Sequence, residues 1–431
     1  MPLRIEKIVY PGKSLGREGG KVVLTDEGLP GELVEIAVLK DKKNFVEAGT
    51  ISILERSAAR IEPRCAHYRA CSSYQCIEYA TQLEIKKAQL KEILGHGLKR
   101  GATEPAVEIA ASPRIWGYRN KIRLRLLKKD DGFQLAYHQP ASLHRFAEVD
   151  SCFLVPEDTN ALLAAVRETA KPGAWEDVEE IEIKRSTLTG EMLIILHAVT
   201  RTRLSEIGTV LGELRGRFRI IGAVGLITTE KGIKEARLWG RNFIEDKAAG
   251  AFFFIGPQSF FQVNAGLLES VLGDIRAFLE LSGQETIADL FCGIGTLGLA
   301  LAPRAREVYG VESEAASVVD LKRNIQRNKA GNFSVCEGSS AEWIEELLDR
   351  GMDAVILDPP RRGLEPGLIE HLLKKPVPRI AYLSCNPTTL ARDLGGLLSG
   401  YNIESVRGYD FFPHTPHIET LAFLRRAKRG G

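Results

Sequence analysis

Long hydrophobic runs are absent from this sequence. The aromatic-rich stretch at 252–255 is stopped by Gly256 and Pro257, well short of the roughly 18 apolar residues that a membrane-spanning helix requires. Residues 1–6 contain no apolar core of a signal peptide. A large excess of charge is also lacking: the formal net charge is +2, so overall charge does not by itself indicate a nucleic-acid partner. We expect a cytoplasmic protein that does not enter a membrane.

Cysteine is scarce, with seven residues in 431, and a cytoplasmic chain of this kind is not expected to carry a disulfide framework. Cys65, Cys71 and Cys76 lie close together in the sequence, and Cys152 follows a strand-like segment. Four thiols are enough for a [4Fe–4S] cluster or for tetrahedral zinc, and their spacing leaves the choice of metal open. We predict that these four cysteines bind a metal.

The length exceeds that of one ordinary hydrophobic core, so two or three domains are expected. Residues 1–57 alternate like short strands separated by glycine-rich turns, which predicts a small OB-like β-barrel. Residues 58–250 show a mixed pattern and predict an α+β central domain that carries the cysteine group. Residues 251–431 alternate between buried strands and amphipathic helices, which predicts a doubly wound, Rossmann-like α/β domain.

A glycine-rich turn follows the first predicted strand of that last domain. Gly293 and Gly295 allow the backbone to approach a ligand closely, and Glu312 ends the next strand about 20 residues later, where an acid can accept both hydroxyls of a ribose. The third glycine of the dinucleotide fingerprint is missing. The pattern therefore indicates a nucleoside-bearing cofactor, with NAD as a competitor.

Two strings then narrow the choice of cofactor. Asp358-Pro359-Pro360-Arg361, at the end of another buried strand, resembles motif IV of S-adenosylmethionine-dependent methyltransferases. The string Asp-Leu-Phe-Cys-Gly-Ile-Gly at 289–295 is similar to their motif I. S-adenosylmethionine contains no pyrophosphate, which agrees with the missing glycine.

Cys385 lies at the carboxyl end of the predicted strand 380–384, at the edge where open α/β sheets present their chemistry. Free cysteines are usually small buried core residues, but this one stops an apolar strand on a polar, turn-prone sequence. Among methyltransferases, a thiol is required where the target is C5 of a pyrimidine, because that carbon becomes nucleophilic only after a thiolate adds to C6. The scheme also needs a base for the C5 proton, and Glu419 is a candidate.

Five strings occur in the order Phe-Gln-Val-Asn, Asp-Leu-Phe-Cys-Gly, Leu-Asp-Pro-Pro-Arg, Ser-Cys-Asn-Pro and His-Ile-Glu-Thr. Together they resemble the RNA (uracil-5-)-methyltransferase family, which makes 5-methyluridine in ribosomal and transfer RNA. The resemblance implies that Cys385 is the nucleophile and Glu419 the proton-abstracting base. The residues that it implies as contacts of S-adenosylmethionine are Gln262, Phe291, Glu312 and Asp358.

The first 57 residues, with Leu-Pro-Gly-Glu at 29–32, are similar to the TRAM domain of many members, which implies a barrel that holds RNA nonspecifically. Many relatives also carry a [4Fe–4S] cluster on C-x5-C-x2-C with a remote fourth cysteine, so the resemblance favours iron–sulfur over zinc. This chain departs from the pattern, because Tyr74 occupies the third position and Cys76 is the nearest substitute.

We therefore predict a cytoplasmic, monomeric RNA methyltransferase that acts on a flipped-out uridine, first in 23S rRNA and second at uridine-54 of tRNA. Cytosine-C5 enzymes place a cysteine where this chain has Arg361, and adenine amino-methyltransferases place an aromatic residue there. A non-catalytic RNA-binding or assembly factor is the alternative from another class. Retention of both Cys385 and Glu419 argues against it.

Overall fold

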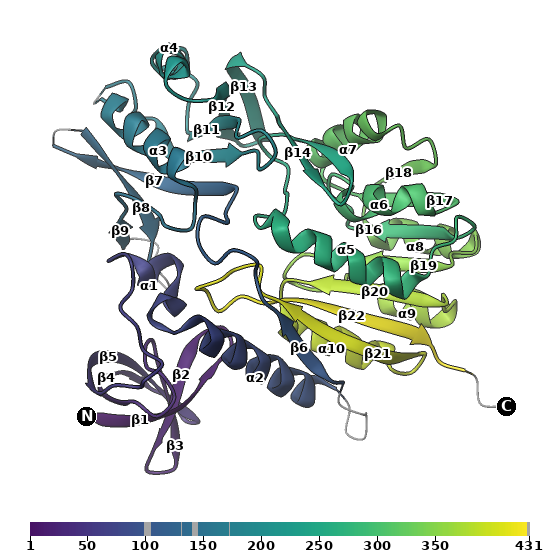
Figure 1. Cartoon of the computed structure of the whole chain (residues 1–431), viewed down its shortest axis with the longest axis horizontal. Coiled ribbons are helices and arrows are strands. Elements are labelled where there is room, and N and C mark those ends of the chain that lie inside the picture. The colour runs from purple at the N-terminus through teal and green to yellow at the C-terminus, as the bar shows by residue number, and fades with distance from the viewer. Residues whose placement is uncertain (99–104, 131, 140–144, 172, 429–431) are drawn as a thin grey trace.

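The computed structural model describes residues 1–98, 105–130, 132–139, 145–171 and 173–428, and its N-terminal part is a closed barrel (Figure 1). The strands pair in the order β1-β2-β3-β5-β4. Alternate residues of β1 point into the barrel, where Leu3 and Ile5 pack against Val34 and Ile36 of β4. The predicted small β-barrel is confirmed. Its strands are β1 (Pro2–Val9), β2 (Lys13–Glu18), β3 (Lys21–Thr25), β4 (Leu33–Asp41) and β5 (Phe45–Glu55).

Two short helices and one long helix follow the barrel. They are α1 (Tyr68–Cys71), the 3-10 helix η1 (Ser73–Cys76) and α2 (Tyr79–Gly97). Helix α2 begins at the N-cap Glu78, whose side chain accepts a hydrogen bond from the Thr81 backbone N–H. It packs against both the barrel and α10 of the C-terminal sheet, and so it connects the two ends of the chain.

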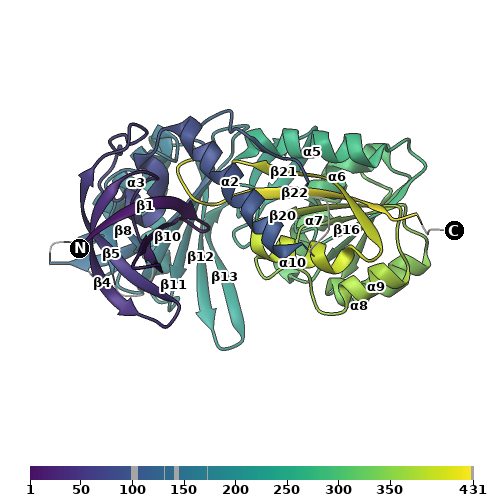
Figure 2. The same ribbon diagram turned by 90° about the horizontal axis from the view of Figure 1, so that it is seen from below.

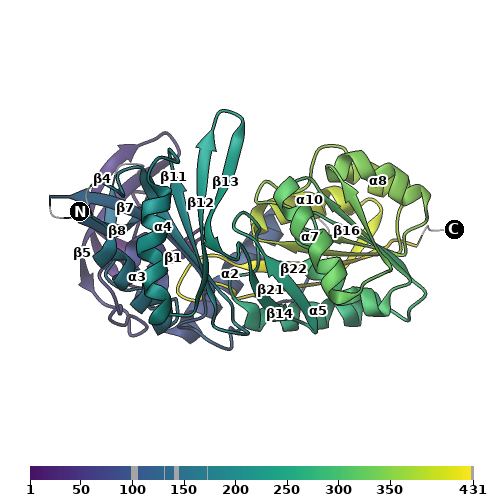
Figure 3. The ribbon, with the colours of Figure 1, turned by 90° about the horizontal axis from the view of Figure 1, so that it is seen from above.

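The middle of the chain forms a seven-stranded sheet in the order β13-β12-β11-β10-β7-β8-β9. Helices α3 (Glu157–Thr169) and α4 (Leu204–Glu213) contribute apolar residues to its core. Figure 3 shows β12 and β13 extending together as a long hairpin. The strands are β7 (Lys121–Lys129), β8 (Gly132–His138), β9 (Phe146–Glu148), β10 (Val178–Arg185), β11 (Met192–Ala198), β12 (Ile220–Thr229) and β13 (Gly232–Gly240).

The C-terminal part is an eight-stranded sheet in the order β18-β17-β16-β19-β20-β22-β21-β6, with helices on both faces. The strands from β18 to β20 are parallel, and β22 runs antiparallel to its neighbours. Its elements are β16 (Thr286–Leu290), β17 (Glu307–Glu312), β18 (Phe333–Glu337), β19 (Ala354–Leu357), β20 (Arg379–Ser384), β21 (Tyr401–Tyr409), β22 (Glu419–Arg426), α5 (Ala265–Leu279), α6 (Thr296–Leu301), α7 (Ala315–Asn328), α8 (Ser340–Asp349), α9 (Leu368–Lys374) and α10 (Pro387–Leu397).

This topology confirms the predicted fold class, a Rossmann-like α/β sheet together with a β-barrel. A two-stranded ribbon, β14 (Ile244–Ala248) and β15 (Ala251–Ile255), leads into it. One strand comes from elsewhere: β6 (Val107–Ala110) lies within residues 58–250 but pairs in parallel with β21. The exact division of the chain into three domains stays a prediction. No helix in the described ranges is long and apolar enough to cross a membrane.

A loop at 410–418 joins β21 to β22 and leaves the C-terminal sheet. Figures 1 and 2 show it extending toward the N-terminal half of the chain. There α2 anchors it, because the buried ammonium Nζ of Lys86 donates to Asp410 Oδ1 at 2.5 Å and to the Phe412 carbonyl at 3.2 Å. We call residues 410–418 the catalytic loop, since the candidate base follows it directly.

Candidate active site

The predicted nucleophile and base meet at one edge of the C-terminal sheet. Cys385 follows the last residue of β20, and Glu419 begins β22. Because β22 is antiparallel to β20, its first residue lies at the carboxyl end of the parallel strands. The register pairs Ser384 with Thr420, which brings Cys385 beside Glu419. Two residues that are 34 positions apart in the sequence are thus neighbours in the fold.

Glu419 is a buried carboxyl without a full set of partners. Only 4% of its surface is exposed, and its Oε2 makes no hydrogen bond within the described part of the chain. Burial, and to a smaller extent Asp358, raise the pKa of this carboxyl to about 8, although Arg361 acts to lower it. A pKa close to neutral pH leaves an ionised fraction of the carboxyl that binds a proton more strongly than an ordinary glutamate, which suits a general base.

Cys385 is partly exposed, unlike most cysteines of the chain. Burial is the main reason that its pKa rises to about 11; Glu419 and Asp358 raise it as well, and Arg361 lowers it. A hydrogen bond joins the loop after β19 to the segment that carries Cys385, because Asn386 Nδ2 donates to the Arg361 carbonyl at 2.9 Å. Asn386 also caps α10, accepting a hydrogen bond from the Thr388 backbone N–H at 3.1 Å.

The proposed cofactor cradle is built from the ends of β16 and β17. The Gly293 N–H donates to Glu312 Oε2 at 2.8 Å, so the glycine turn and the acid at the end of β17 face each other. Gly293 and Gly295 have φ of +57° and +85°, a region that favours glycine. Phe291, at the same turn, has φ of +62° and a partly exposed side chain. Asp358 follows β19 at the same edge, and burial raises its pKa to about 7.

Gln262 lies in the segment between β15 and α5. Its side chain is buried, and its Oε1 has no hydrogen-bond partner among the described residues. Asp289 Oδ1, below the glycine turn, is also buried and without a partner, while Asp289 Oδ2 accepts from the Gly298 N–H at 2.8 Å. Buried polar atoms without partners are uncommon unless a ligand or water satisfies them. The residues present therefore fit S-adenosylmethionine, with Gln262, Phe291, Glu312 and Asp358 as the groups that would hold it.

The anchoring of the catalytic loop was not foreseen from the sequence. Besides Lys86, Gln82 of α2 accepts from the His414 N–H at 2.9 Å and donates to the Tyr74 carbonyl at 3.1 Å. Gln82, Lys86 and Gln89 are spaced by four and three residues and are all buried. A polar stripe at helical spacing was the signal that could have indicated this contact.

Three of the four predicted metal-binding cysteines are neighbours. The Cys65 thiol receives a hydrogen bond from Gln75 Nε2 at 3.3 Å, and the Cys71 thiol lies 3.2 Å from Ser72 Oγ. Cys152, from the loop before α3, lies 3.6 Å from the Tyr137 hydroxyl. Burial raises the pKa of Cys71 to about 12; among the smaller contributions, Cys152 and Cys65 raise it too.

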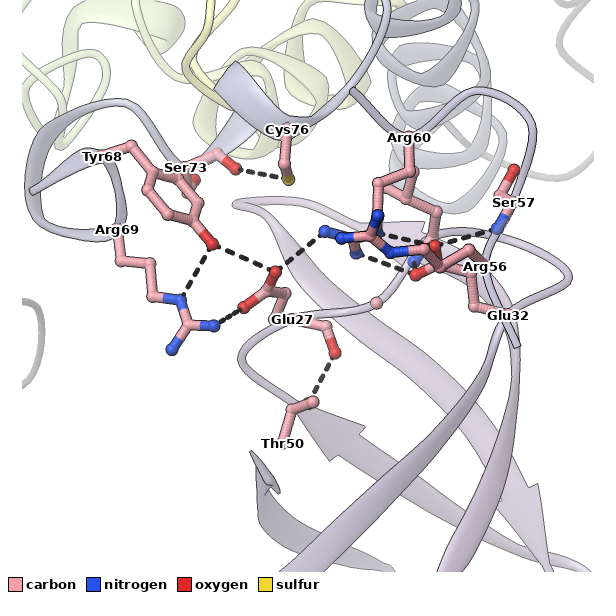
Figure 4. A network of polar contacts seen from close by, with 12 residues as sticks. Glu27, Glu32, Thr50, Arg56, Ser57, Arg60, Tyr68, Arg69, Ser73 and Cys76 are labelled. Carbon is pink, nitrogen blue, oxygen red and sulfur yellow. Dashed lines mark hydrogen bonds and ion pairs between the residues drawn. The ribbon is translucent and has the colours of Figure 1, made fainter. Parts of the chain in front are cut away.

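Cys76 lies apart from those three. Figure 4 shows it beside the ion pairs of Glu27, Glu32 and Arg60, with its thiol donating to the Ser73 carbonyl at 3.5 Å. Tyr74, which occupies the third position of the family pattern, is buried and receives a hydrogen bond from Gln89. Over residues 1–98, 105–130, 132–139, 145–171 and 173–428, no group of three or more His, Cys, Asp or Glu is arranged to hold a metal ion. The residues present do not fit a four-cysteine iron–sulfur cluster or zinc site, and the sequence-based prediction for Cys76 has no support here.

Comparison with known proteins agrees with this geometry. A family model described as tRNA (Uracil-5-)-methyltransferase matches residues 78–427. An RNA methyltransferase of Clostridium tetani is 33% identical, over 98% of this chain and 97% of the relative, and one of Thermosynechococcus vestitus is 31% identical with the same coverage. Among solved structures, Pyrococcus abyssi tRNA (uracil-54, C5)-methyltransferase in complex with S-adenosyl-L-homocysteine has a TM-score of 0.76 and 25% identity. The match covers 98% of this chain and 99% of that one.

Fold, site and relatives together define an S-adenosylmethionine-dependent RNA methyltransferase, as predicted. More particularly, the chain belongs to the tRNA (uracil-5-)-methyltransferase family. The alternative of a non-catalytic RNA-binding factor is not supported.

Proposed function

We propose that this protein methylates C5 of a uridine in RNA through a covalent bond between Cys385 and C6 of the base. The observation that carries the proposal is the register of β20 and β22, which sets the Cys385 thiol beside the Glu419 carboxyl at the edge of the cofactor cradle. A thiol and an unpaired buried carboxyl are the two groups that this chemistry requires.

The Cys385 thiolate adds to C6, and the electron pair of the C5–C6 double bond moves toward the C4 carbonyl, which makes C5 nucleophilic. S-adenosylmethionine, when bound, supplies the methyl group. After C5 has taken it, Glu419 removes the C5 proton, the double bond re-forms, and the bond between C6 and the Cys385 sulfur breaks. The thiolate is thereby regenerated, and Glu419 carries one proton that passes to water.

The arrangement of charges suits these steps. The Arg361 guanidinium is the positive group that lowers the pKa of both Cys385 and Glu419. It therefore favours the thiolate before addition and the carboxylate before proton removal. The burial of Glu419 acts in the opposite direction and keeps the carboxyl basic enough to accept a proton from carbon.

The variant Cys385→Ala tests the covalent step. It should bind RNA and S-adenosylmethionine and transfer no methyl group, measured with a tritiated methyl donor. Cys336→Ala is the matched control for loss of a buried thiol, because three strands of the sheet separate β18 from β20, and it should leave turnover unchanged. Appreciable turnover by Cys385→Ala would exclude the covalent mechanism.

The proposal also concerns which class of RNA, 23S rRNA or tRNA, is the substrate. From the sequence, 23S rRNA is the first candidate, with the barrel holding RNA like a TRAM domain. The likeness to the P. abyssi enzyme favours tRNA as the second candidate, since it extends over 98% of this chain and includes the barrel. Mapping 5-methyluridine in both RNAs from cells that lack the protein distinguishes them: the RNA that loses the modification is the substrate. The cytoplasmic location and the monomeric state stay predictions.

A further inference from the structure

The turn between β1 and β2 brings the barrel to the catalytic loop. Gly12 in this turn lies so close to Pro416 that an added Cβ would be 3.0 Å from the Pro416 Cβ and 3.1 Å from its Cγ. Pro416 is three residues before Glu419. Gly12 also has φ of +96°, so a side chain is disfavoured there on both grounds. The tip of the barrel is therefore packed directly on the segment that carries the base.

The same turn is held from a second side by α2. Gln89 Nε2 donates to the Ile8 carbonyl of β1 at 2.9 Å and to the Tyr74 hydroxyl at 3.0 Å. Lys7 forms an ion pair with Glu92 of α2 at 2.6 Å. Since α2 also anchors the catalytic loop through Gln82 and Lys86, the turn and the loop share one rigid support.

Tyr10 is the large side chain of this turn, and it is half-buried. Burial raises the pKa of its phenol to about 12; Arg361 lowers it, and Cys385 and Glu419 raise it. The phenol is thus within electrostatic reach of the proposed nucleophile, the proposed base and their arginine. Throughout the described ranges, its hydroxyl makes no hydrogen bond to another residue. A half-buried aromatic ring at the edge that carries the proposed nucleophile and base is available for contact with an unpaired base.

We propose that Tyr10 is a substrate-contacting residue of the methyl-transfer site, with its ring packed against the flipped-out uridine. This inference rests on the proposed function and deepens it. The barrel then does more than hold RNA at a distance, because one of its own side chains completes the pocket for the base. Aromatic side chains commonly stack on unpaired bases in RNA-binding proteins, and removing one such ring weakens the interaction by roughly tenfold to a hundredfold.

The test measures covalent trapping on in-vitro transcripts of 23S rRNA and of tRNA that contain 5-fluorouridine. Fluorine at C5 cannot leave as a proton, so the enzyme–RNA adduct accumulates after methyl transfer. At saturating RNA, Tyr10→Ala should trap about tenfold to a hundredfold more slowly than the wild type, while Tyr10→Phe, which keeps the ring, should stay within about threefold. Phe45→Ala is the control for loss of a barrel aromatic, because its ring lies against Lys42 of the same barrel. It should change the rate by no more than about twofold.

Three results would overturn the proposal. Tyr10→Ala could trap at the wild-type rate, Tyr10→Phe could be as slow as Tyr10→Ala, or Tyr10→Ala could lose equal affinity for the same RNA with the target uridine replaced by cytidine. The last result would reduce Tyr10 to a general RNA contact. Binding of S-adenosylhomocysteine and the thermal midpoint verify that each variant is folded. If the wild type itself traps neither transcript, the proposed function fails as well, so the two failures are distinguishable.

Discussion

Two buried glutamates of this chain show how burial can serve opposite purposes. Glu32, in the barrel, is fully buried, and both of its oxygens are occupied: they accept from the backbone N–H groups of Leu29 and Ser57 and from two nitrogens of Arg60 (Figure 4). Glu419 is almost as deeply buried, yet its Oε2 has no partner within the described residues. Both carboxyls lose contact with water, and only for Glu32 do hydrogen bonds to both oxygens compensate for that loss.

The difference appears in the proton affinity of the two carboxyls. Burial acts to raise the pKa of Glu32, but the hydrogen bonds from Arg60 and the backbone outweigh it, and the pKa falls below its ordinary value. For Glu419 no hydrogen bond offsets burial, the opposing charge of Arg361 is too weak to do so, and the pKa rises to about 8. The hydrogen bonds of Glu32 therefore favour its ionised form, whereas their absence leaves Glu419 with a raised proton affinity, which is characteristic of groups in reactive sites.

The largest expected effect is on turnover in Glu419→Gln. Glutamine has the shape of glutamate but cannot remove the C5 proton, so steady-state methylation should fall about 10²- to 10⁴-fold. The enzyme–RNA adduct should then persist on a denaturing gel with ordinary, unfluorinated RNA. Glu345→Gln, on the exposed side of α8, is the control and should behave as the wild type. Normal product release from Glu419→Gln would remove this residue as the base.

The opposite pattern is expected for Glu32→Ala. This change leaves the buried Arg60 guanidinium without its main partner, and breaking a buried ion pair in this way destabilises a protein by about 3–5 kcal/mol. Unfolding of the barrel in urea, followed by circular dichroism, should move to lower denaturant. The bond-making step at saturating RNA should be retained by the molecules that remain folded. An unchanged unfolding midpoint would show that the network in Figure 4 contributes little.

Much of the catalytic sheet could be predicted from the sequence, because its signals are local. Buried strands that end shortly before Gly293, Asp358 and Cys385 indicate the functional edge without knowledge of any distant contact. The amphipathic helices expected within residues 251–431 include α5, which buries its apolar residues on one face. These features follow from periodicity and from the rule that parallel strands end at one edge.

The rest depends on contacts between distant segments, which leave little local trace. Strand β6 is only four residues long, and nothing in its sequence indicates that it joins β21. Spacing suggested Cys76 as a metal ligand, but the η1 turn directs its thiol toward Ser73. Tyr10 reads in the sequence as an ordinary aromatic residue of a turn, and only the packing of that turn on Pro416 brings it near the proposed site. Spacing along the chain carries no information on such tertiary contacts.

A smaller effect concerns stability against pH. Because the folded pKa of Glu419 is raised, its contribution to stability is fully present below the unfolded value near 4.5 and is lost as pH rises toward 8. The glutamine of Glu419→Gln does not titrate. The difference in free energy of unfolding between the variant and the wild type should therefore shift in favour of the variant by about 1 kcal/mol from pH 6 to pH 7, since one pKa unit corresponds to about 1.4 kcal/mol. Denaturant midpoints at pH 5, 6, 7 and 8 measure the gap. A gap that is constant with pH would mean that the carboxyl is ionised throughout.

The smallest effect is expected from substitution of Arg361. Arg361 lowers the pKa of Glu419 and Cys385, as Arg60 lowers that of Glu32, but its side chain is exposed. Arg60 is buried and directly bonded, whereas Arg361 acts through space and partly through solvent, which screens it. Arg361→Gln should therefore raise the pKa of Cys385 only slightly and slow its alkylation by iodoacetamide about two- to fivefold at pH 8. Arg362→Gln, at the exposed neighbouring position, is the matched control. Equal effects of the two variants would mean that general positive charge, rather than the position of Arg361, favours the thiolate. A slower alkylation of Cys385 in Arg361→Gln alone would show that this exposed arginine favours the ionised form of its neighbours, as the buried Arg60 does for Glu32 in the barrel.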